Sequence, residues 1–233
     1  MQFPDPLLRG RLVKRYKRFM VDVILDTGET VTAHCANTGA MIGVQEPGSE
    51  VWLSPARNPD RKLKFTWEMI RIADGLVGIN TAHPNKIVAE AIEGGHIPEL
   101  SGYTNLRGEV KYGKNSRIDI LLSSDGKPDC YVEIKNVHLM RTPGNAEFPD
   151  SVSTRAAKHQ AELTNMVAEG ARAVTFYLCQ RTACDDFRLA ADIDPGYADA
   201  ATEARSKGVE SLCYACNLTP EAITVSHRLE IKN

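Results

Sequence analysis

The stretch RIDILLSSDGKPDCYVEIKNV, residues 117–137, decides the fold of the second half of this chain. Two β-like segments, 117–122 and 130–137, flank the turn-rich SSDGKPD, and this pattern predicts a β-hairpin. A hairpin centred on Gly126 places Asp119 directly across from Glu133, because the two residues are equally far from the turn. Side chains alternate along a strand, so Lys135 shares the face of Glu133. One patch of sheet is therefore predicted to hold Asp119, Glu133 and Lys135.

Facing carboxylates are unfavourable in a sheet unless a cation lies between them, and Lys135 alone cannot neutralise two charges. Oxygen ligands favour Mg²⁺ or Mn²⁺, ions that keep bound water able to attack a phosphate. The plainer alternative is a surface salt bridge without function. Asp129 is a poor second ligand, since four residues of extended chain separate it from Glu133 by about 13 Å.

The segments around the hairpin alternate in type. A helix is predicted from Pro84 to the Gly94-Gly95 pair, followed by strands at 108–112, 117–122 and 130–137. Ser153 or Thr154 caps a helix that runs to about Glu169, and 173–180 forms a buried strand. The order is α, β, β, β, α, β. A last helix near 197–207 and two strands, 209–218 and 222–231, complete the prediction.

The first eighty residues show only short β-like segments, from Leu7 to Thr81. Asp26-Thr27-Gly28 is suited to a hairpin turn, because Gly28 can adopt a positive φ. Some five strands in this length predict a small barrel of the OB type, a fold whose sheet commonly binds single strands. The expected domains are 1–82, an OB-fold-like barrel, and 83–233, with the boundary near residues 81–84.

Composition excludes several classes of protein. The chain has 233 residues, of which 42% are hydrophobic, with a formal net charge of −2, so it is neither fibrous, disordered nor histone-like. We expect no membrane span and no signal peptide, and hence a cytoplasmic location. One segment, RGRLVKRYKR at 9–18, carries six basic residues and no acidic one. A solvated strand face or a polyanion-binding stripe would explain it, and Arg11, Arg15, Lys17 and Arg18 are its candidate nucleic-acid contacts.

Two further motifs are open to a functional and a plainer interpretation. Asn37-Thr38-Gly39 is most simply a turn in which Gly39 adopts a backbone shape that other residues resist, although Asn37 could contact a phosphate. Cys213 and Cys216 resemble half of a zinc site, with Cys179 and Cys184 as the other half. Residues three apart on a strand point to opposite faces, so buried thiols are expected instead.

The αβββαβ order, with Asp119 on the second strand and Glu133-Ile134-Lys135 on the third, resembles the PD-(D/E)XK nuclease superfamily. The resemblance implies that both acids hold the metal and that the lysine orients or polarises the attacking water. It also implies an acid on the first helix as a metal ligand, with Glu90 as the candidate and Glu93 as the weaker alternative, and a contribution from the backbone carbonyl of Ile134. Helix two is implied to supply further polar site residues, and Lys158, His159, Gln160 and Glu162 are available there.

More narrowly, the whole chain resembles the sugar fermentation stimulation protein A (SfsA) family, known as DNA-binding proteins linked to maltose metabolism. The motifs that carry the resemblance are RYKRF (15–19), HCANTGAM (34–41), NTAHPNKIVAEAI (80–92), YGKNSRIDILL (112–122), CYVEIKNVHL (130–139) and RAAKHQAEL (155–163). The family implies an OB-fold followed by a PD-(D/E)XK-like domain. Asn136 departs from the pattern, since a small Ser is expected after the lysine.

The leading hypothesis is a DNA-binding protein that is a Mg²⁺- or Mn²⁺-dependent nuclease. Its rivals are a non-catalytic DNA-binding regulator of sugar metabolism and a protein-interaction module that uses the barrel. The sequence leaves open DNA against RNA, single against double strands, and the oligomeric state, with a homodimer as one option.

Overall fold

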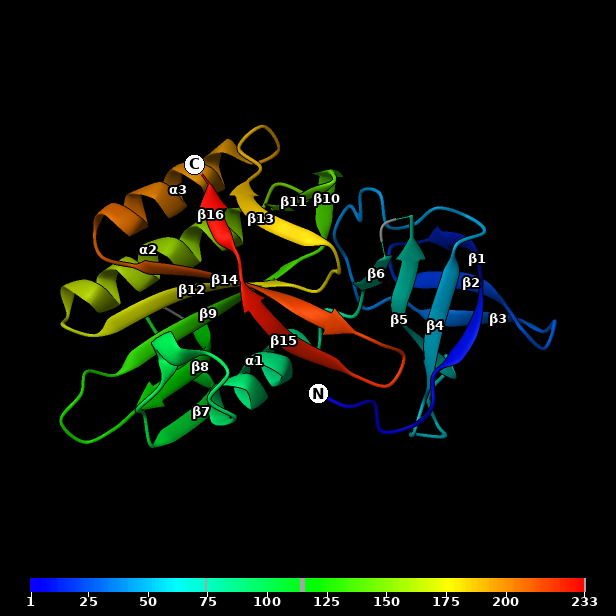
Figure 1. Cartoon of the computed structure of the whole chain (residues 1–233), viewed down its shortest axis with the longest axis horizontal. Helices are drawn as coiled ribbons and strands as arrows, with labels where there is room; N and C mark the ends of the chain where they lie inside the picture. The colour runs from blue at the N-terminus through cyan, green and yellow to red at the C-terminus, as the bar shows by residue number, and fades with distance from the viewer. Residues whose placement is uncertain (74, 114–115, 233) are drawn as a thin grey trace.

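The computed structural model describes residues 1–73, 75–113 and 116–232. Lys114 and Asn115, part of the 112–122 motif, lie outside the described residues. Within these residues, no helix is both long and apolar enough to cross a membrane. The chain forms a β-barrel followed by a larger mixed α/β half (Figure 1).

The N-terminal barrel is built from one continuous antiparallel sheet. Its strands are β1 (Leu8–Tyr16), β2 (Met20–Leu25), β3 (Thr30–His34), β4 (Glu50–Pro55), β5 (Phe65–Ile72) and β6 (Gly75–Gly78). The order is β3-β2-β1-β4-β5-β6, and a parallel pairing of His34 with Thr66 closes β3 onto β5. Gly28 forms the β2–β3 turn at φ 88°, as its sequence position predicts. The five-stranded closed barrel expected from the sequence is therefore present, with β6 added at its edge.

The C-terminal half contains a six-stranded sheet in the order β15-β14-β12-β9-β8-β7. Its strands are β7 (Asn105–Tyr112), β8 (Ser116–Ser123), β9 (Cys130–Val137), β12 (Arg172–Cys179), β14 (Glu210–Leu218) and β15 (Ile223–Arg228). Its helices are α1 (Pro84–Glu93), α2 (Thr154–Ala168) and α3 (Pro195–Ser206), with a short 3-10 turn η1 (Pro98–Leu100). The order α1, β7, β8, β9, α2, β12 is the αβββαβ core predicted from the sequence.

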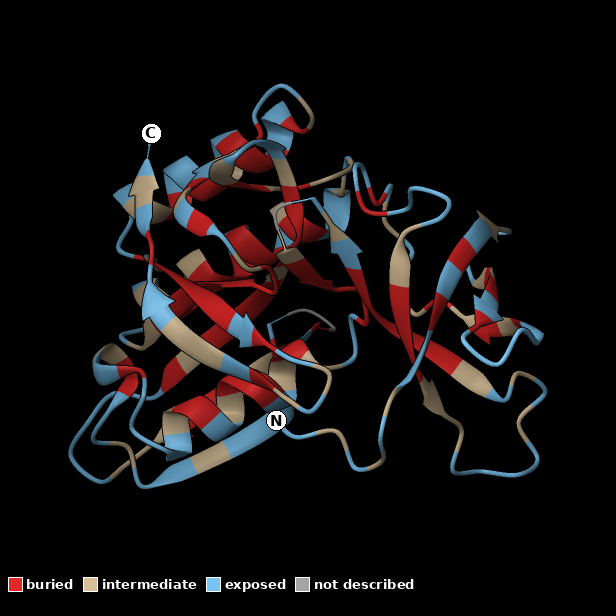
Figure 2. Cartoon of the chain, turned by 45° about the vertical axis from the view of Figure 1, so that its right-hand side comes forward, coloured by how far each residue is buried: buried red, intermediate tan, exposed pale blue. Residues whose placement is uncertain are grey.

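Two cores lie on opposite faces of this sheet, and Figure 2 shows its central strands as largely buried. On one face, Ile87 and Val88 of α1 pack with Val132 and Ile134. On the other face, α2 and α3 pack against β12 and Val137. Alternation along β9 therefore turns Glu133, Lys135 and Val137 toward α2. All six cysteines are buried free thiols, and the sequence predicted burial for Cys179, Cys184, Cys213 and Cys216.

Local sequence explains where α1 and α2 begin and end. Pro84 lies in the first turn of α1, where the backbone N–H that proline lacks would have no partner within the helix. Gly94 follows Glu93, the last residue of α1. The Ser153 side chain accepts the N–H of Ala156 at 3.2 Å and so caps α2. Gly170, at φ 90°, follows the end of α2.

A second, four-stranded sheet was not predicted from the sequence. It consists of β10 (Leu139–Thr142), β11 (Gly144–Phe148), β13 (Cys184–Leu189) and β16 (Glu230–Lys232). The predicted strand 222–231 is thereby divided, with β15 in the large sheet and β16 in the small one. β10 and β11 form a short, irregular hairpin with each other, whereas β13 pairs with β11 and β16 across long sequence separations. Strands of three to six residues with distant partners leave little periodicity to detect.

The barrel and the C-terminal half meet along β6. Gly78 N–H donates to the carbonyl of Gln180 at 2.8 Å, and Val77 forms an isolated bridge with Arg181. At the other end, the Met1 amino group donates to the carbonyl of Ile223 at 2.8 Å. The proposed boundary between residues 82 and 83 lies just before α1.

Candidate active site

The register of the β8–β9 hairpin agrees with the sequence prediction. Ile120 pairs with Val132, and Leu122 pairs with Cys130, so the hairpin is centred on Gly126. Continued by one residue, this register sets Asp119 opposite Glu133. The strands separate at this point, because the Asp119 carboxylate accepts the N–H of Ile134 at 2.7 Å in place of a ladder bond. Both carboxylates consequently reach the same pocket.

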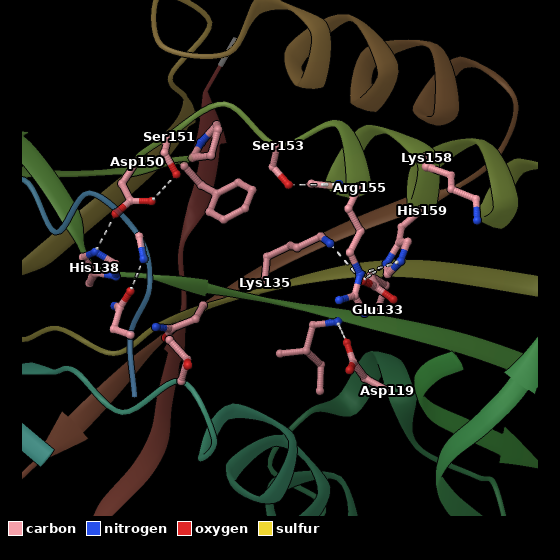
Figure 3. Close-up of a pocket in the computed structure, with 18 of the residues that line it drawn as sticks. Asp119, Glu133, Lys135, His138, Asp150, Ser151, Ser153, Arg155, Lys158 and His159 are labelled. Atoms are coloured by element: carbon pink, nitrogen blue, oxygen red, sulfur yellow. Dashed lines mark hydrogen bonds and ion pairs between the residues drawn. The ribbon is translucent and has the colours of Figure 1, made fainter. Parts of the chain in front are cut away.

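That pocket has a volume of about 670 Å³ and lies where the barrel meets the α2 side of the sheet (Figure 3). Its walls come from β8, β9, α2, the segment 148–153 and the barrel. The residues discussed below that line it are Asn37, Gly39, Glu109, Arg117, Asp119, Glu133, Ile134, Lys135, Asn136, His138, Asp150, Arg155, Lys158 and His159. Among these residues, most of the side chains carry charge or hydrogen-bonding groups, which suits a polar or charged ligand.

Glu133 lines the pocket and is held by two donor side chains. It is 4% exposed, and its Oε1 accepts from Lys135 Nζ at 2.8 Å and from His159 Nδ1. Arg155 Nε donates to the other ring nitrogen of His159 at 3.4 Å, which agrees with a proton on Nδ1. Burial favours the neutral acid, but the bonds and charges of His159 and Lys135 outweigh it and lower the pKa of Glu133.

The pKa of Asp119 is displaced in the opposite direction from that of Glu133. Burial and the nearby charge of Glu133 raise its pKa to about 6, although bonds from Ile134 N–H and Asn85 oppose the rise. Two neighbouring carboxyl groups with pKa values displaced in opposite directions are characteristic of functional sites. The pair carries negative charge that a cation in the pocket would relieve.

The donor atoms fit a hard divalent cation. Glu133 Oε2 is buried and has no hydrogen-bond partner among the described residues. Across the same residues, no group of three or more His, Cys, Asp or Glu side chains is placed to hold a metal. Asp119, Glu133 and the carbonyl of Ile134 are oxygen donors of this pocket that could hold such a cation.

Glu90, the acid that the resemblance implies on the first helix, does not reach this pocket. Its carboxylate forms an ion pair with the Met1 amino group at 2.7 Å, and the two line a separate cavity. Glu93 is exposed and lies outside the pocket as well. From α1, it is Asn85 that reaches the site, where its Nδ2 donates to Asp119 Oδ1 at 2.9 Å. Glu90 lies more than a turn further along α1, where the helix faces the N-terminus.

A different acid, Glu109, lies beside Asp119 and was missed in the sequence. Asn85 Nδ2 also donates to Glu109 Oε1, at 3.1 Å, so both carboxylates share one amide. Glu109 adopts φ 56° within β7, and Arg117 Nη1 donates to its carbonyl at 2.9 Å. A left-handed non-glycine residue inside a strand is uncommon. Extending the predicted strand pairing from β8 to β7 would have identified Glu109, because it lies across from Asp119 between the pairs Gly108–Ile120 and Val110–Ile118.

The expected helix-two residues divide by their position around α2. His159 and Lys158 line the pocket, and Lys158 forms an ion pair with Glu162 at 3.4 Å. Gln160 does not line the pocket. It is 1% exposed, and its side chain forms hydrogen bonds with Tyr197 and Thr175 in the core. Each residue turns 100° around a helix, so the neighbour of a pocket residue can face the core.

Within the described residues, the basic run on β1 does not line the pocket. Arg9 and Arg11 pair with Glu50, and Lys14 pairs with Asp22. Lys17 is exposed at the β1–β2 turn with φ 49°. Arg15 and Arg18 instead donate to carbonyls of the segment 37–39. Asn37 of that segment does line the pocket.

Comparisons with known proteins cover nearly the whole chain. Residues 13–79 match the family model described as the SfsA N-terminal OB domain, and residues 82–222 match the sugar fermentation stimulation protein RE domain. A sugar fermentation stimulation protein homolog of Paramagnetospirillum magneticum is 59% identical over 96% of this chain and 94% of its own length. One from Rhodospirillum rubrum is 57% identical over 94% of each. The solved structure of Pyrococcus furiosus SfsA in complex with Ca²⁺ has a TM-score of 0.89 at 26% identity, covering 100% of this chain and 98% of that one.

Proposed function

Since this chain belongs to the SfsA family, we propose that it binds DNA and hydrolyses phosphodiesters with Mg²⁺ or Mn²⁺ held by Asp119 and Glu133. The observation that carries the proposal is the pocket in which Asp119, Glu133 and Lys135 meet, with the pKa values of the two acids displaced in opposite directions. The P. furiosus relative was solved with Ca²⁺, which supports a divalent cation in this family.

The side chains around Glu133 have distinct roles in this proposal. Lys135 and His159 fix Glu133 Oε1, so that Oε2 faces the ligand. Lys135 is 8% exposed, and its ammonium would orient the attacking water. A divalent cation bound there would lower the pKa of that water and offset charge on the phosphate.

The basic side chains that line the pocket suit a phosphate backbone. Arg155, Lys158 and Arg117 line the pocket and would attract a polyanion, and guanidinium groups match phosphate geometry. An OB barrel beside the site supports a nucleic acid as the partner. The substrate would therefore be held by the C-terminal half and the barrel together.

The decisive experiment compares cleavage of single-stranded, duplex and branched DNA in Mg²⁺ or Mn²⁺ by wild type and Glu133→Ala. We expect a cleavage activity that the variant lacks and that Asp129→Ala retains, because Asp129 lies outside the pocket. A wild type that binds DNA tightly but cleaves none of these substrates would instead support the non-catalytic regulator.

A further inference from the structure

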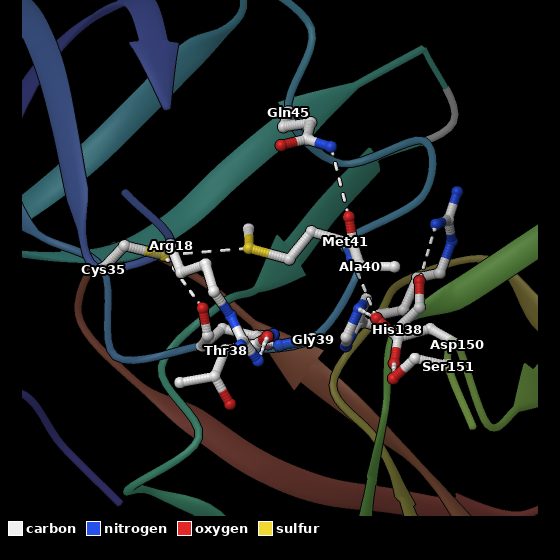
Figure 4. Close-up of polar contacts among 12 residues, drawn as sticks. Arg18, Cys35, Thr38, Gly39, Ala40, Met41, Gln45, His138, Asp150 and Ser151 are labelled. Atoms are coloured by element: carbon white, nitrogen blue, oxygen red, sulfur yellow. Dashed lines mark hydrogen bonds and ion pairs between the residues drawn. The ribbon is translucent and has the colours of Figure 1, made fainter. Parts of the chain in front are cut away.

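A short barrel segment, Asn37–Met41, forms part of the wall of the active-site pocket and rests on the C-terminal half (Figure 4). We call this segment the barrel loop. Asn37 and Gly39 line the pocket together with Glu133 and Lys135. The barrel loop therefore shares a pocket with the acids, although it comes from the other half of the chain.

Asp150 of the C-terminal half holds the barrel loop by a hydrogen bond. Its Oδ2 accepts the Met41 N–H at 2.9 Å and lies 3.2 Å from His138 Nε2, while Oδ1 accepts from Ser151 Oγ at 3.3 Å. Burial acts against the ionised form, but His138 and the Met41 N–H outweigh it and lower the pKa of Asp150 to about 2. Asp150 is thus a partly buried carboxylate that bonds both halves of the protein.

The fit between the barrel loop and Asp150 is close. A Cβ at Gly39 would lie 2.6 Å from Asp150 Oδ2 and 2.9 Å from Oδ1, nearer than such atoms approach. Gly39 is not among the residues with a positive φ, so its backbone shape does not account for the glycine. Glycine is needed at position 39 because the Asp150 carboxylate occupies the space of a side chain.

Two arginines brace the barrel loop from the barrel side. Arg15 Nη2 donates to the carbonyls of Asn37 at 3.0 Å and Gly39 at 3.2 Å, and Arg18 Nη2 donates to that of Thr38 at 3.0 Å. These two members of the basic run therefore stabilise a backbone shape. The barrel loop is held from both sides.

The side chain of Asn37 has a buried donor that these bonds leave without a partner. Asn37 Oδ1 accepts the Gly39 N–H at 2.8 Å, which fixes the orientation of the carboxamide. Its Nδ2 has no hydrogen-bond partner among the described residues, and Asn37 is 2% exposed. A buried, oriented donor without an acceptor at the wall of a polar pocket indicates a ligand acceptor.

We propose that Asp150 is a positioning residue that seats the barrel loop on the active site, so that Asn37 Nδ2 donates to a substrate phosphate next to the one attacked. The inference rests on the proposed nucleic-acid function and deepens it. The barrel is then part of the substrate site and not a detachable tether, and a bound strand must contact both halves at once.

The test measures the affinity of a fluorescent single-stranded oligonucleotide in Ca²⁺ for wild type, Asn37→Ala, Asp150→Ala and the double variant. Loss of one hydrogen bond to a charged phosphate weakens binding by roughly 10- to 100-fold. We expect both single variants to show such a loss and the double variant to show little more, because both changes remove the same contact. Asp125→Asn, at an exposed turn, is the matched control.

A second measurement follows the hydrogen bond between the Met41 N–H and Asp150 in the absence of nucleic acid. Hydrogen exchange at the Met41 amide should accelerate in Asp150→Ala and less in Asp150→Asn, which keeps an oxygen acceptor. This measurement also shows whether a variant is folded.

Each outcome bears on a different claim. If wild type binds the oligonucleotide and Asp150→Ala binds it equally well, or if the two losses add in the double variant, the positioning role of Asp150 is overturned while the proposed function stands. If wild type binds no nucleic acid in any condition, both fall, and faster exchange at Met41 would leave Asp150 with a purely structural role.

Discussion

Asp119 accepts the backbone N–H of Ile134 at 2.7 Å, just beyond the last ladder pair of their strands, Ile120 with Val132. The side chain takes the place of a backbone carbonyl at the point where the sheet opens. One oxygen of Asp119 is thereby fixed to β9, and the other faces Asn85 and the pocket. The hydrogen bond from the Ile134 N–H therefore accounts both for the separation of the two strands and for the orientation of the Asp119 carboxylate.

Cation binding should depend on pH through Asp119. Its raised pKa, about 6, means that the cation-free protein holds a proton there below that pH. Ca²⁺ should therefore bind more weakly as the pH falls from 7 to 5, with release of a proton. Titration calorimetry in buffers of different ionisation enthalpy measures that proton. Asp119→Asn should abolish the release, and an unchanged release would contradict the assignment.

The same shift affects stability. An acid with a raised folded-state pKa stabilises the fold fully below its unfolded value, and that contribution is lost as the pH rises through the folded value. The free energy of unfolding of the cation-free protein should fall as the pH rises from about 4 to about 6. Urea unfolding of Asp119→Asn should show a flatter profile over this range than wild type.

Lys135→Met should separate binding from turnover. The variant should keep most of its DNA affinity and lose roughly 10²–10⁴-fold in cleavage rate, the range for loss of acid–base assistance. Removing a positive charge beside Glu133 should leave Ca²⁺ affinity level or improve it. Parallel loss of binding and cleavage would show that Lys135 is a phosphate anchor instead.

Glu109 and Glu90 should behave differently toward divalent cations. Glu109→Gln removes negative charge beside Asp119, so we expect weaker Ca²⁺ binding. Glu90→Gln should leave Ca²⁺ binding unchanged and lower the melting temperature, because it removes the partner of the Met1 amino group. Calorimetry and thermal unfolding of the two variants check this. The reverse pattern would favour the first-helix acid after all.

The salt dependence of DNA binding should identify which cations contact phosphate. Arg155→Ala should lower the magnitude of the log-affinity slope by about 0.7 for a single strand, since Arg155 lines the pocket. Arg11→Ala is the control, because its guanidinium is engaged by Glu50 and the carbonyl of Gly48 on the barrel surface. A slope that responds to Arg11 and not to Arg155 would move the binding surface to the outside of the barrel.

The sequence by itself determined the features that depend on local periodicity and turns. Hairpin register around Gly126 and the alternation of β9 together predicted that Asp119, Glu133 and Lys135 share one site. A turn and a two-residue repeat are properties of neighbouring residues, so they can be counted along the chain.

Only the tertiary structure decided what surrounds those residues. The rotation of α1 and α2 against the sheet, which packing sets, brings Asn85 and His159 to the site and turns Glu90 and Gln160 away from it. The hydrogen bond from the Met41 N–H to Asp150 joins residues that are 109 positions apart in the sequence. Such contacts depend on how distant elements pack together, and no local pattern in the sequence records them.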